Sequence, residues 1–182
     1  MQAYRLLKNT NTSFFLTGRA GTGKTTFIQN AQKEIKKNFV ILAPTGVAAI
    51  NAGGMTIHSF FGFEPKVLTP YDRASINRDN FKILRAADTI IIDEVSMVRC
   101  DVIDAINRTL QKCMRNTLPF GGKQMLFVGD MFQLEPIVSG DDKEEMKRLY
   151  GERKPFFFNA DVFSHITINP IELRQVYRQV DE

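Results

Sequence analysis

The residues best suited to chemistry lie in Gly18–Thr25, which reads GRAGTGKT. This stretch fits the phosphate-binding pattern G-x-x-x-x-G-K-[ST], in which glycines let the backbone wrap closely around phosphate because they have no Cβ. Lys24 can reach the β- and γ-phosphates, and the Thr25 hydroxyl can ligate Mg²⁺. The stretch therefore predicts a nucleoside triphosphate site, with a chance glycine-rich turn as the alternative.

The flanks of this loop favour the phosphate site over the chance turn. Ser13–Thr17 is a short apolar run typical of a strand, and after the loop apolar residues recur at helical spacing, at Phe27, Ile28, Ala31 and Ile35. A strand, a glycine turn and a helix N-terminus together make an anion site, since backbone N–H groups point inward and the helix dipole favours negative charge. We therefore expect the loop to hold the phosphates of a nucleotide.

Two adjacent carboxylates, Asp93 and Glu94, follow the apolar run that begins at Thr89. The end of a buried parallel strand lies at the edge of the sheet where α/β proteins bind ligands. Asp93 suits the carboxylate on the Mg²⁺ side, and Glu94 suits the group that orients and deprotonates an attacking water. A hydrolase profits from this second acid, whereas a kinase need not have it. The alternative is a helix N-cap with acids favoured by the dipole.

A third strand-like run, Gln124–Gly129, is followed by Asp130, with Gln133 just beyond it. A neutral amide near the γ-phosphate can hydrogen-bond both a phosphate oxygen and water, so it can sense hydrolysis. A solvated surface glutamine is the usual case, and only the position of Gln133 after a strand favours the sensor.

Apolar runs alternate with helical patterns along the chain, which predicts a parallel sheet covered on both faces. The predicted strands are Ser13–Thr17, Phe39–Ala43, Thr89–Asp93, Gln124–Gly129 and Ile166–Ile168. The predicted helices are Met1–Lys8, Lys24–Lys37, Gly46–Asn51, Asn80–Ala87, the segment with an apolar face from Val102 to Cys113, and Asp141–Tyr150. We expect Glu64–Asn77 to be a surface excursion, and the phenylalanines of Pro155–Asn159 to pack in the core rather than form a stacking surface.

Composition places the chain among ordinary globular domains, with 182 residues, 43% hydrophobic and 24% charged. The net charge of +4 is compatible with a polyanion partner without indicating one. Cys100 and Cys113 have no metal-ligand spacing and are expected to be buried thiols in a reducing cytoplasm. The sequence has no signal peptide and no run of about 18 apolar residues, so we expect a cytoplasmic protein, nucleoid-associated if bacterial, with no membrane partner.

Taken together, these stretches resemble superfamily 1 helicases. Ala43–Phe61, APTGVAAINAGGMTIHSFF, is similar to the corresponding region of the Pif/RecD-type 5′→3′ DNA helicases. The Pif branch is matched most closely, through APTGVAAIN, GG-x-TIHSFF, IIDEVSMV, PFGGKQ, VGD-x-xQL-x-P and the terminal YRQ. The resemblance runs from Phe15 to Gln179 in long, collinear strings. It implies that residues 1–182 form a three-layer α/β/α, RecA-like P-loop ATPase domain with a mainly parallel sheet, which uses ATP and Mg²⁺.

The resemblance also implies roles for particular residues. The triphosphate and its metal would be held by Gly21, Thr22, Gly23, Lys24, Thr25 and Thr26. Beside Lys24, catalysis would involve the Walker B pair Asp93 and Glu94, the sensor Gln133, and Arg178, an arginine that reaches the γ-phosphate. Single-stranded DNA would lie along Pro44, Thr45, Gly46, Asn51, Thr56, His58 and Phe60.

The chemistry of these residues, taken without the resemblance, gives only weak support for DNA binding. Small or neutral polar groups can hydrogen-bond phosphate or sugar oxygens, which fixes register without reading sequence. Aromatic rings can stack on bases, and here they would be Phe60, Phe61 and Phe63. Chemistry alone favours core positions for His58 and the phenylalanines over DNA contacts. The resemblance favours DNA contacts instead for His58 and Thr56, and does so less strongly for the phenylalanines. The sequence has no lysine or arginine stripe, so we expect modest, salt-sensitive affinity for DNA.

The leading prediction is the N-terminal motor domain of an ATP-dependent 5′→3′ DNA helicase, monomeric and acting on single-stranded DNA. The alternatives are a small kinase or stand-alone NTPase, and a non-catalytic nucleotide-gated binding module. Because the sequence stops at Glu182 just past an apolar segment, we expect the second RecA-like domain and the wedge element to lie outside it. The 182-residue chain alone is then expected to bind nucleotide weakly, hydrolyse it very slowly and not unwind a duplex.

Overall fold

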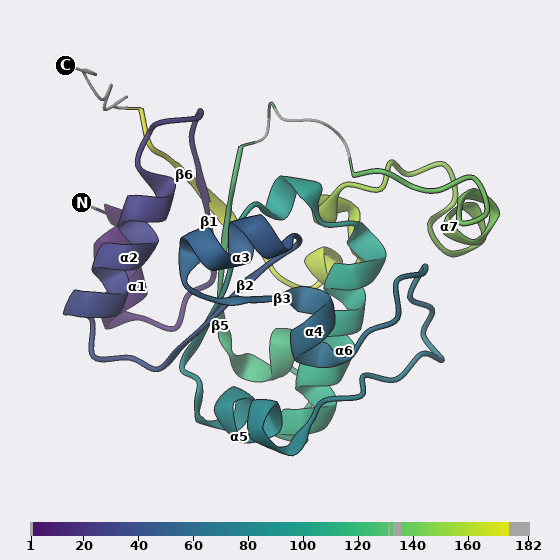
Figure 1. Ribbon diagram of the computed structural model, residues 1–182, viewed down its shortest axis with the longest axis horizontal. Coiled ribbons are helices and arrows are strands. Elements are labelled where there is room, and N and C mark those ends of the chain that lie inside the picture. Colours follow the sequence, from purple (N-terminus) through teal and green to yellow (C-terminus); the bar gives the residue numbers. More distant parts are fainter. Residues whose placement is uncertain (1, 131, 133–135, 175–182) are drawn as a thin grey trace.

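The computed structural model describes residues 2–130, 132 and 136–174. A six-stranded sheet crosses the molecule in the order β3-β2-β4-β5-β1-β6, and every neighbouring pair is parallel (Figure 1). The strands are β1 (Phe14–Thr17), β2 (Phe39–Ala43), β3 (Met55–Thr56), β4 (Thr89–Ile92), β5 (Gln124–Gly129) and β6 (Asn169–Glu172). Because all six strands are parallel, their carboxyl ends meet at one edge of the sheet.

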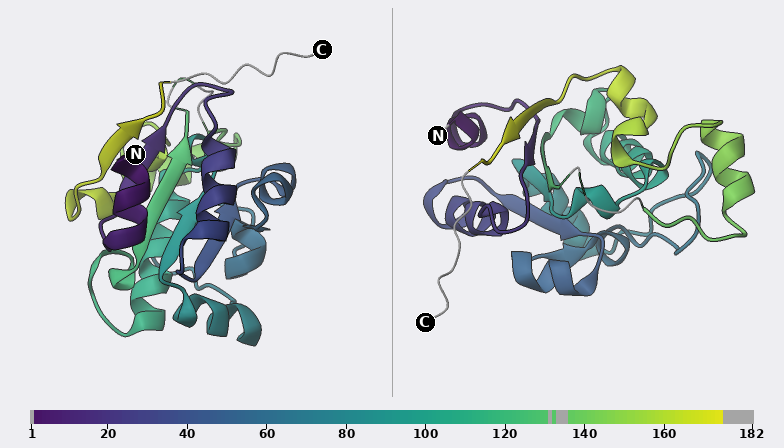
Figure 2. Two further views of the ribbon diagram at one scale, coloured as in Figure 1. Left: turned by 90° about the vertical axis from the view of Figure 1, so that its left-hand side faces the viewer. Right: turned by 90° about the horizontal axis from the view of Figure 1, so that it is seen from above.

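Helices cover both faces of this sheet, which confirms the predicted layers (Figures 1 and 2). The α-helices are α1 (Gln2–Asn9), α2 (Lys24–Glu34), α3 (Gly46–Ala52), α4 (Ile57–Phe61), α5 (Arg78–Ala86), α6 (Cys100–Met114) and α7 (Lys143–Tyr150). Short 3₁₀ turns are η1 (Val95–Met97), η2 (Pro119–Gly122), η3 (Phe157–Asn159) and η4 (Asp161–Ser164). The first two helices lie at one end of the molecule and α7 lies at the other.

Side chains alternate along each strand between two separate cores. Leu126 and Val128 of β5 pack with α1 and α2 on one face. Met125 and Phe127 pack on the other face, against α4, α5, α6 and the segments around η3 and η4. The central strands are buried throughout, because a parallel sheet with helices on both sides has no solvated face.

The position predicted for the last strand, Ile166–Ile168, was wrong. Ile166 and Ile168 are partly buried hydrophobics packed against the core, and the strand β6 begins after them and pairs with β1. β6 is mostly exposed and contains Pro170, which an edge strand tolerates because one side of its backbone has no ladder partner. The open edge of β1, rather than an apolar run, therefore determines where β6 forms.

The predicted surface excursion, residues 64–77, contains no helix or strand, but its middle is anchored to the protein body. Val67 and Leu68 are buried, and the Leu68 N–H donates to Oδ2 of Asp101 over 2.8 Å. Arg99 donates to the same carboxylate and to the carbonyl of Lys66. This segment is therefore held against the start of α6.

The three phenylalanines after Pro155 differ in environment. Phe157 is buried, with its ring centroid 5.4 Å from that of Phe15 and 6.0 Å from that of Phe127. Phe158 is 42% exposed and stacks on the half-buried Phe156. The core prediction is confirmed for Phe157 only.

Two expectations from composition can also be compared with the structure. Cys100 is buried, which raises the pKa of its thiol to about 12, whereas Cys113 is only partly buried. In the described part of the chain, no group of His, Cys, Asp or Glu side chains is arranged to hold a metal ion by itself. No helix within those residues has the length and apolar character needed to cross a membrane.

Candidate nucleotide and DNA site

The phosphate-binding loop joins the end of β1 to the start of α2, as the sequence predicts. Gly21 and Gly23 have φ angles of 77° and 85°, in the left-handed region that strains any residue with a Cβ. Within the loop, the Thr22 backbone N–H and hydroxyl both donate to the carbonyl of Arg19, over 3.3 and 2.8 Å. These bonds hold the loop in a tight turn over the N-terminus of α2.

Lys24 is held inside this turn and is only 8% exposed. Its ammonium donates to the carbonyls of Gly18 and Arg19, over 2.6 and 3.1 Å. A phosphate is a charged acceptor and makes stronger hydrogen bonds than a neutral carbonyl does. The ammonium is therefore already at the loop and can exchange a carbonyl partner for a phosphate oxygen.

Asp93 follows β4 directly and is 3% exposed. Its Oδ1 accepts the Glu94 N–H over 2.9 Å. Burial raises the pKa of this carboxyl, and the positive charge of Lys24 acts in the opposite direction. A buried carboxylate near a lysine, at the carboxyl edge of a parallel sheet, is suited to bind a cation.

Glu94 has a φ of 50° and a ψ of 41°, which is unusual for a residue with a side chain. Such a conformation costs about 1–3 kcal/mol and is concentrated at functional sites. The backbone on both sides maintains it, because β4 ends just before and η1 begins just after. The side chain is half-buried beside Asp93.

The end of β5 reaches the same place. A Cβ at Gly129 would come within 3.2 Å of the Ser96 nitrogen and of Val95 Cγ1, so this strand end packs directly on η1. Asp130, which the sequence left without a role, is 7% exposed and accepts the Phe132 N–H over 3.0 Å. The predicted sensor Gln133 and the predicted arginine Arg178 lie outside the described residues.

The candidate DNA residues lie around α3 and α4, after the carboxyl ends of β2 and β3. Thr45 and Thr56 are N-caps whose hydroxyls accept the N–H of Ala48 and Ser59, over 3.2 and 3.3 Å. The other exposed or half-buried members of the set are Pro44, Gly46, Asn51 and His58. Each threonine thus combines a capping role with an accessible position.

His58 is half-buried, and its ring centroid lies 6.3 Å from that of Phe63. Burial lowers the pKa of the imidazole, and the charge of Arg99 lowers it further. The ring is therefore neutral at pH 7, with one nitrogen as a donor and the other as an acceptor. It can hydrogen-bond a phosphate or sugar oxygen without contributing a full charge.

Phe60 was wrongly predicted to contact DNA. It is 2% exposed, and its ring packs edge-on against Phe61 at 5.1 Å between centroids. Phe61 and Phe63 are buried as well, so none of these rings offers a face to a base. The physical reason is that α4 turns this side toward the sheet, where the Phe60 carbonyl also accepts a hydrogen bond from Asn80.

A cavity of about 230 Å³ lies beside His58, and its lining includes Lys66, Met97, Arg99 and Ile137. Arg99, which the sequence did not single out, donates from Nε and Nη2 to Asp101, each over 2.9 Å. It is the N-cap residue of α6 and lies shortly after the carboxylate pair. In the sequence, Arg99 is simply an arginine two residues before an aspartate, Asp101. That spacing alone does not indicate that the two side chains pair beside a cavity.

Comparison with known proteins gives matches over nearly the whole chain. The profile of the PIF1-like helicase family matches residues 3–182. The ATP-dependent DNA helicase PIF1 of Candida albicans is 34% identical over 177 residues, which cover 92% of this chain and 19% of that protein. The ATP-dependent DNA helicase Pif1 of Bdellovibrio bacteriovorus is 39% identical over 128 residues, which cover 68% of this chain and 29% of that protein.

Solved structures of Pif1 helicases also match over nearly the whole chain. Bacteroides Pif1 bound to ssDNA superposes with a TM-score of 0.90 and 40% identity, over 99% of this chain and 42% of that chain. The Bacteroides Pif1 helicase in complex with ADP-AlF3 and ssDNA gives a TM-score of 0.91 at the same identity and coverage. These matches confirm the predicted three-layer, RecA-like fold. The chain spans less than a third of the length of the two curated relatives.

Proposed function

The chain belongs to the PIF1-like helicase family, and from this premise we propose that it is the first motor domain of an ATP-dependent 5′→3′ DNA helicase. Residues 1–182 form one RecA-like ATPase domain, and the second RecA-like domain and the wedge element belong to other parts of the full-length protein. The geometry of Asp93 and Glu94 beside the phosphate loop carries this proposal. Because hydrolysis needs both domains, the 182-residue chain alone is inactive or very slow.

On the nucleotide side, the loop residues Gly21–Thr26 hold the triphosphate of ATP, and Lys24 exchanges a loop carbonyl for a phosphate oxygen. The Thr25 hydroxyl and the buried Asp93 carboxylate fit Mg²⁺, since this ion takes hard oxygen ligands. When bound, the ion would neutralise charge that develops between the β- and γ-phosphates. Burial alone disfavours the charged form of Asp93, and a nearby cation would restore it.

Glu94 orients the attacking water and accepts its proton. Its left-handed backbone, between β4 and η1, holds the residue beside Asp93. The side chain is therefore positioned before the reaction starts. Gln133 as sensor and Arg178 as the arginine at the γ-phosphate remain part of the proposal on the strength of the sequence motifs. A kinase or a non-catalytic nucleotide module is not favoured, because neither calls for this second acid.

On the DNA side, a single strand lies along the outer surface of α3 and α4. Its contacts are Pro44, Thr45, Gly46, Asn51, Thr56 and His58. The polar members of this set, Thr45, Asn51, Thr56 and His58, would fix the position of the DNA backbone without reading sequence. We take the active unit to be a monomer in the cytoplasm, at the nucleoid in a bacterium, although one structural relative is described as two coordinating Pif1 helicases.

The test is Glu94→Gln in the full-length protein. Single-strand-stimulated ATP hydrolysis should fall by about 10²–10⁴-fold, because the amide cannot accept the proton, while nucleotide affinity stays near the wild-type value. Glu144→Gln, on the exposed side of α7, is the matched control and should leave the rate unchanged. A Glu94→Gln enzyme that still hydrolyses ATP at the wild-type rate would overturn the proposed role.

A further inference from the structure

The cavity of about 230 Å³ beside His58 has an apolar interior. Ile57, Val98 and Val102 line it, and each of these side chains is at most 4% exposed. Pockets that enclose drug-sized ligands have volumes of about 300–1,000 Å³, so this cavity suits a smaller group. The charges and hydrogen-bonding groups of the lining indicate which kind of group that is.

The lining contains two cations, Lys66 and Arg99, and both are engaged in ion pairs. The Lys66 ammonium has two carboxylate partners, over 2.9 and 2.7 Å, and the Arg99 guanidinium has two, over 2.9 and 3.7 Å. The four partners are Glu64, Asp72, Asp101 and Asp142. Since two positive charges face four negative ones in these ion pairs, this lining is unfavourable for a phosphate group.

His58 adds hydrogen-bonding capacity to the cavity without a charge. Burial lowers the pKa of its imidazole, so at pH 7 the ring is neutral and has one donor and one acceptor nitrogen. A nucleobase is also neutral, with donors and acceptors along its edges and a π-face on each side. An apolar cavity with one neutral polar group therefore matches a base better than a phosphate.

The proposed DNA path passes the mouth of this cavity. Pro44 and His58 are contacts in that path, and both also line the cavity. Thr45 and Thr56 are accessible nearby and are not part of the lining, so a strand whose phosphates contact these threonines can turn a base toward the cavity. Because the phenylalanines in and after α4 are buried, an apolar contact to a base has to come from other side chains.

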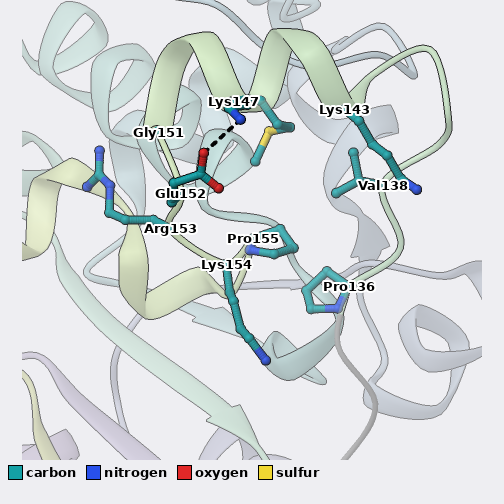
Figure 3. Close-up of a pocket in the computed structure, with 10 residues that line it drawn as sticks. Pro136, Val138, Lys143, Lys147, Gly151, Glu152, Arg153, Lys154 and Pro155 are labelled. Carbon is teal, nitrogen blue, oxygen red and sulfur yellow. Dashed lines mark ion pairs between the residues drawn. The ribbon is translucent and has the colours of Figure 1, made fainter.

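Two exposed apolar side chains, Met97 and Ile137, lie at the rim of the cavity and are 48% and 89% exposed. The neighbours of Ile137 in the chain, Pro136 and Val138, line a second cavity of about 360 Å³, between α7 and residues 151–155 (Figure 3). Contacts on the α7 side therefore hold the chain on both sides of Ile137. A ligand that covers Met97 and Ile137 removes apolar surface from water, which is favourable.

We propose that the cavity beside His58 is a base pocket, which takes one unstacked nucleobase of the bound single strand, covered by Met97 and Ile137. This inference rests on the proposed function and adds a base contact to its DNA surface. Contact of this kind accepts any base, because every base has a π-face. Such tolerance suits a protein that moves along a strand.

The experiment compares the binding of two labelled probes by the full-length protein, using fluorescence anisotropy without nucleotide. One probe is an oligothymidylate, and the other is the same sugar-phosphate chain without bases, so both have equal numbers of phosphates. The salt concentration is lowered until the wild-type protein binds both probes, since the phosphate contacts strengthen at low salt.

Met97→Ala with Ile137→Ala should weaken binding of the oligothymidylate by about 3–10-fold and change binding of the abasic strand by less than about twofold. The slope of log Kd against log salt should stay the same, because no phosphate contact is removed. The matched control, Ile83→Ala with Leu118→Ala, removes two exposed apolar side chains that precede β4 and β5 and should leave both affinities unchanged. Unchanged melting temperatures of both double variants check that the fold is intact.

Each outcome has a separate meaning. A loss confined to the oligothymidylate supports the base pocket. Equal losses on the two probes, or unchanged affinity for both, would overturn it while leaving the DNA path in place. Failure of the wild-type protein to bind either probe at any salt concentration would instead overturn the proposed function.

Discussion

The proposed nucleotide site contains two charged residues held in buried positions, Lys24 and Asp93. Burial raises the pKa of Asp93, so the folded protein binds this proton more tightly than the unfolded chain does. A group with a raised pKa contributes stability below its unfolded pKa, and that contribution is lost as pH rises through the folded pKa. At neutral pH the Asp93 carboxylate therefore destabilises the fold, which is the cost of the cation-binding role that we propose for it.

Asp93→Asn should therefore raise the melting temperature at pH 7, on the order of 2–4 °C for a chain of this size, because the amide is neutral and can still accept the Glu94 N–H. The gain should shrink as pH falls toward the pKa of Asp93, where the wild-type residue is also neutral. In the full-length protein the same change should abolish ATP hydrolysis. Asp141→Asn, at an exposed position, is the control, and a melting temperature lowered by Asp93→Asn would contradict this account.

At the scale of elements, glycines at helix ends decide how close neighbouring segments come. α4 ends at Gly62, which has a φ of 67°, and a Cβ there would lie 2.2 Å from the carbonyl oxygen of Ser75. The return of the 64–77 segment to the end of α4 therefore requires glycine. Gly46, at the start of α3, has nothing within 4 Å of the position of a Cβ.

Gly62→Ala should lower the free energy of unfolding by about 1–3 kcal/mol or more, because it combines a left-handed backbone with a backbone clash. Gly46→Ala should be neutral, or stabilise by about 0.4–1 kcal/mol through the reduced entropy of the unfolded chain. Urea unfolding of the two variants and the wild type measures both effects. Equal stability of the two variants would show that the contact between Gly62 and Ser75 is not restrictive.

At the scale of the whole molecule, phenylalanines join the segment after α7 to the sheet. Phe157 packs on Phe15 of β1 and Phe127 of β5, so one side chain from the C-terminal part touches two central strands. These are the strands whose carboxyl ends lead into the phosphate loop and to Asp130. The position of the site therefore depends on a core completed by residues far along the chain.

Phe157→Ala should cost about 3–5 kcal/mol in the free energy of unfolding, since it leaves a cavity in the core. Phe158→Ala removes the same atoms from a ring that is 42% exposed, and should cost less than about 1 kcal/mol. Chemical denaturation of both variants gives the comparison. A loss of similar size at the two positions would refute the assignment of Phe157 alone to the core.

Local sequence was sufficient for the features that depend on local physics. β2 and β5 have the predicted bounds, Phe39–Ala43 and Gln124–Gly129, because continuous apolar runs bounded by turn residues are typical of buried strands. The loop between β1 and α2 followed from glycine and lysine spacing, and the position of Asp93 from its place after such a run. These residues determine their own conformation, so the loop and the strand end could be predicted, while their role in nucleotide binding belongs to the proposal.

Only the tertiary structure decided which side chains face solvent and which distant segments meet. Aromatic residues at helical spacing do not reveal which side of α4 turns inward, so Phe60 was assigned to DNA although it is buried. β6 depends on the open edge of β1, and the cavity beside α7 depends on this helix folding back beside residues 151–155. Contacts of this kind form between segments separated along the chain. Pattern and spacing are local, and therefore contain no direct information about them.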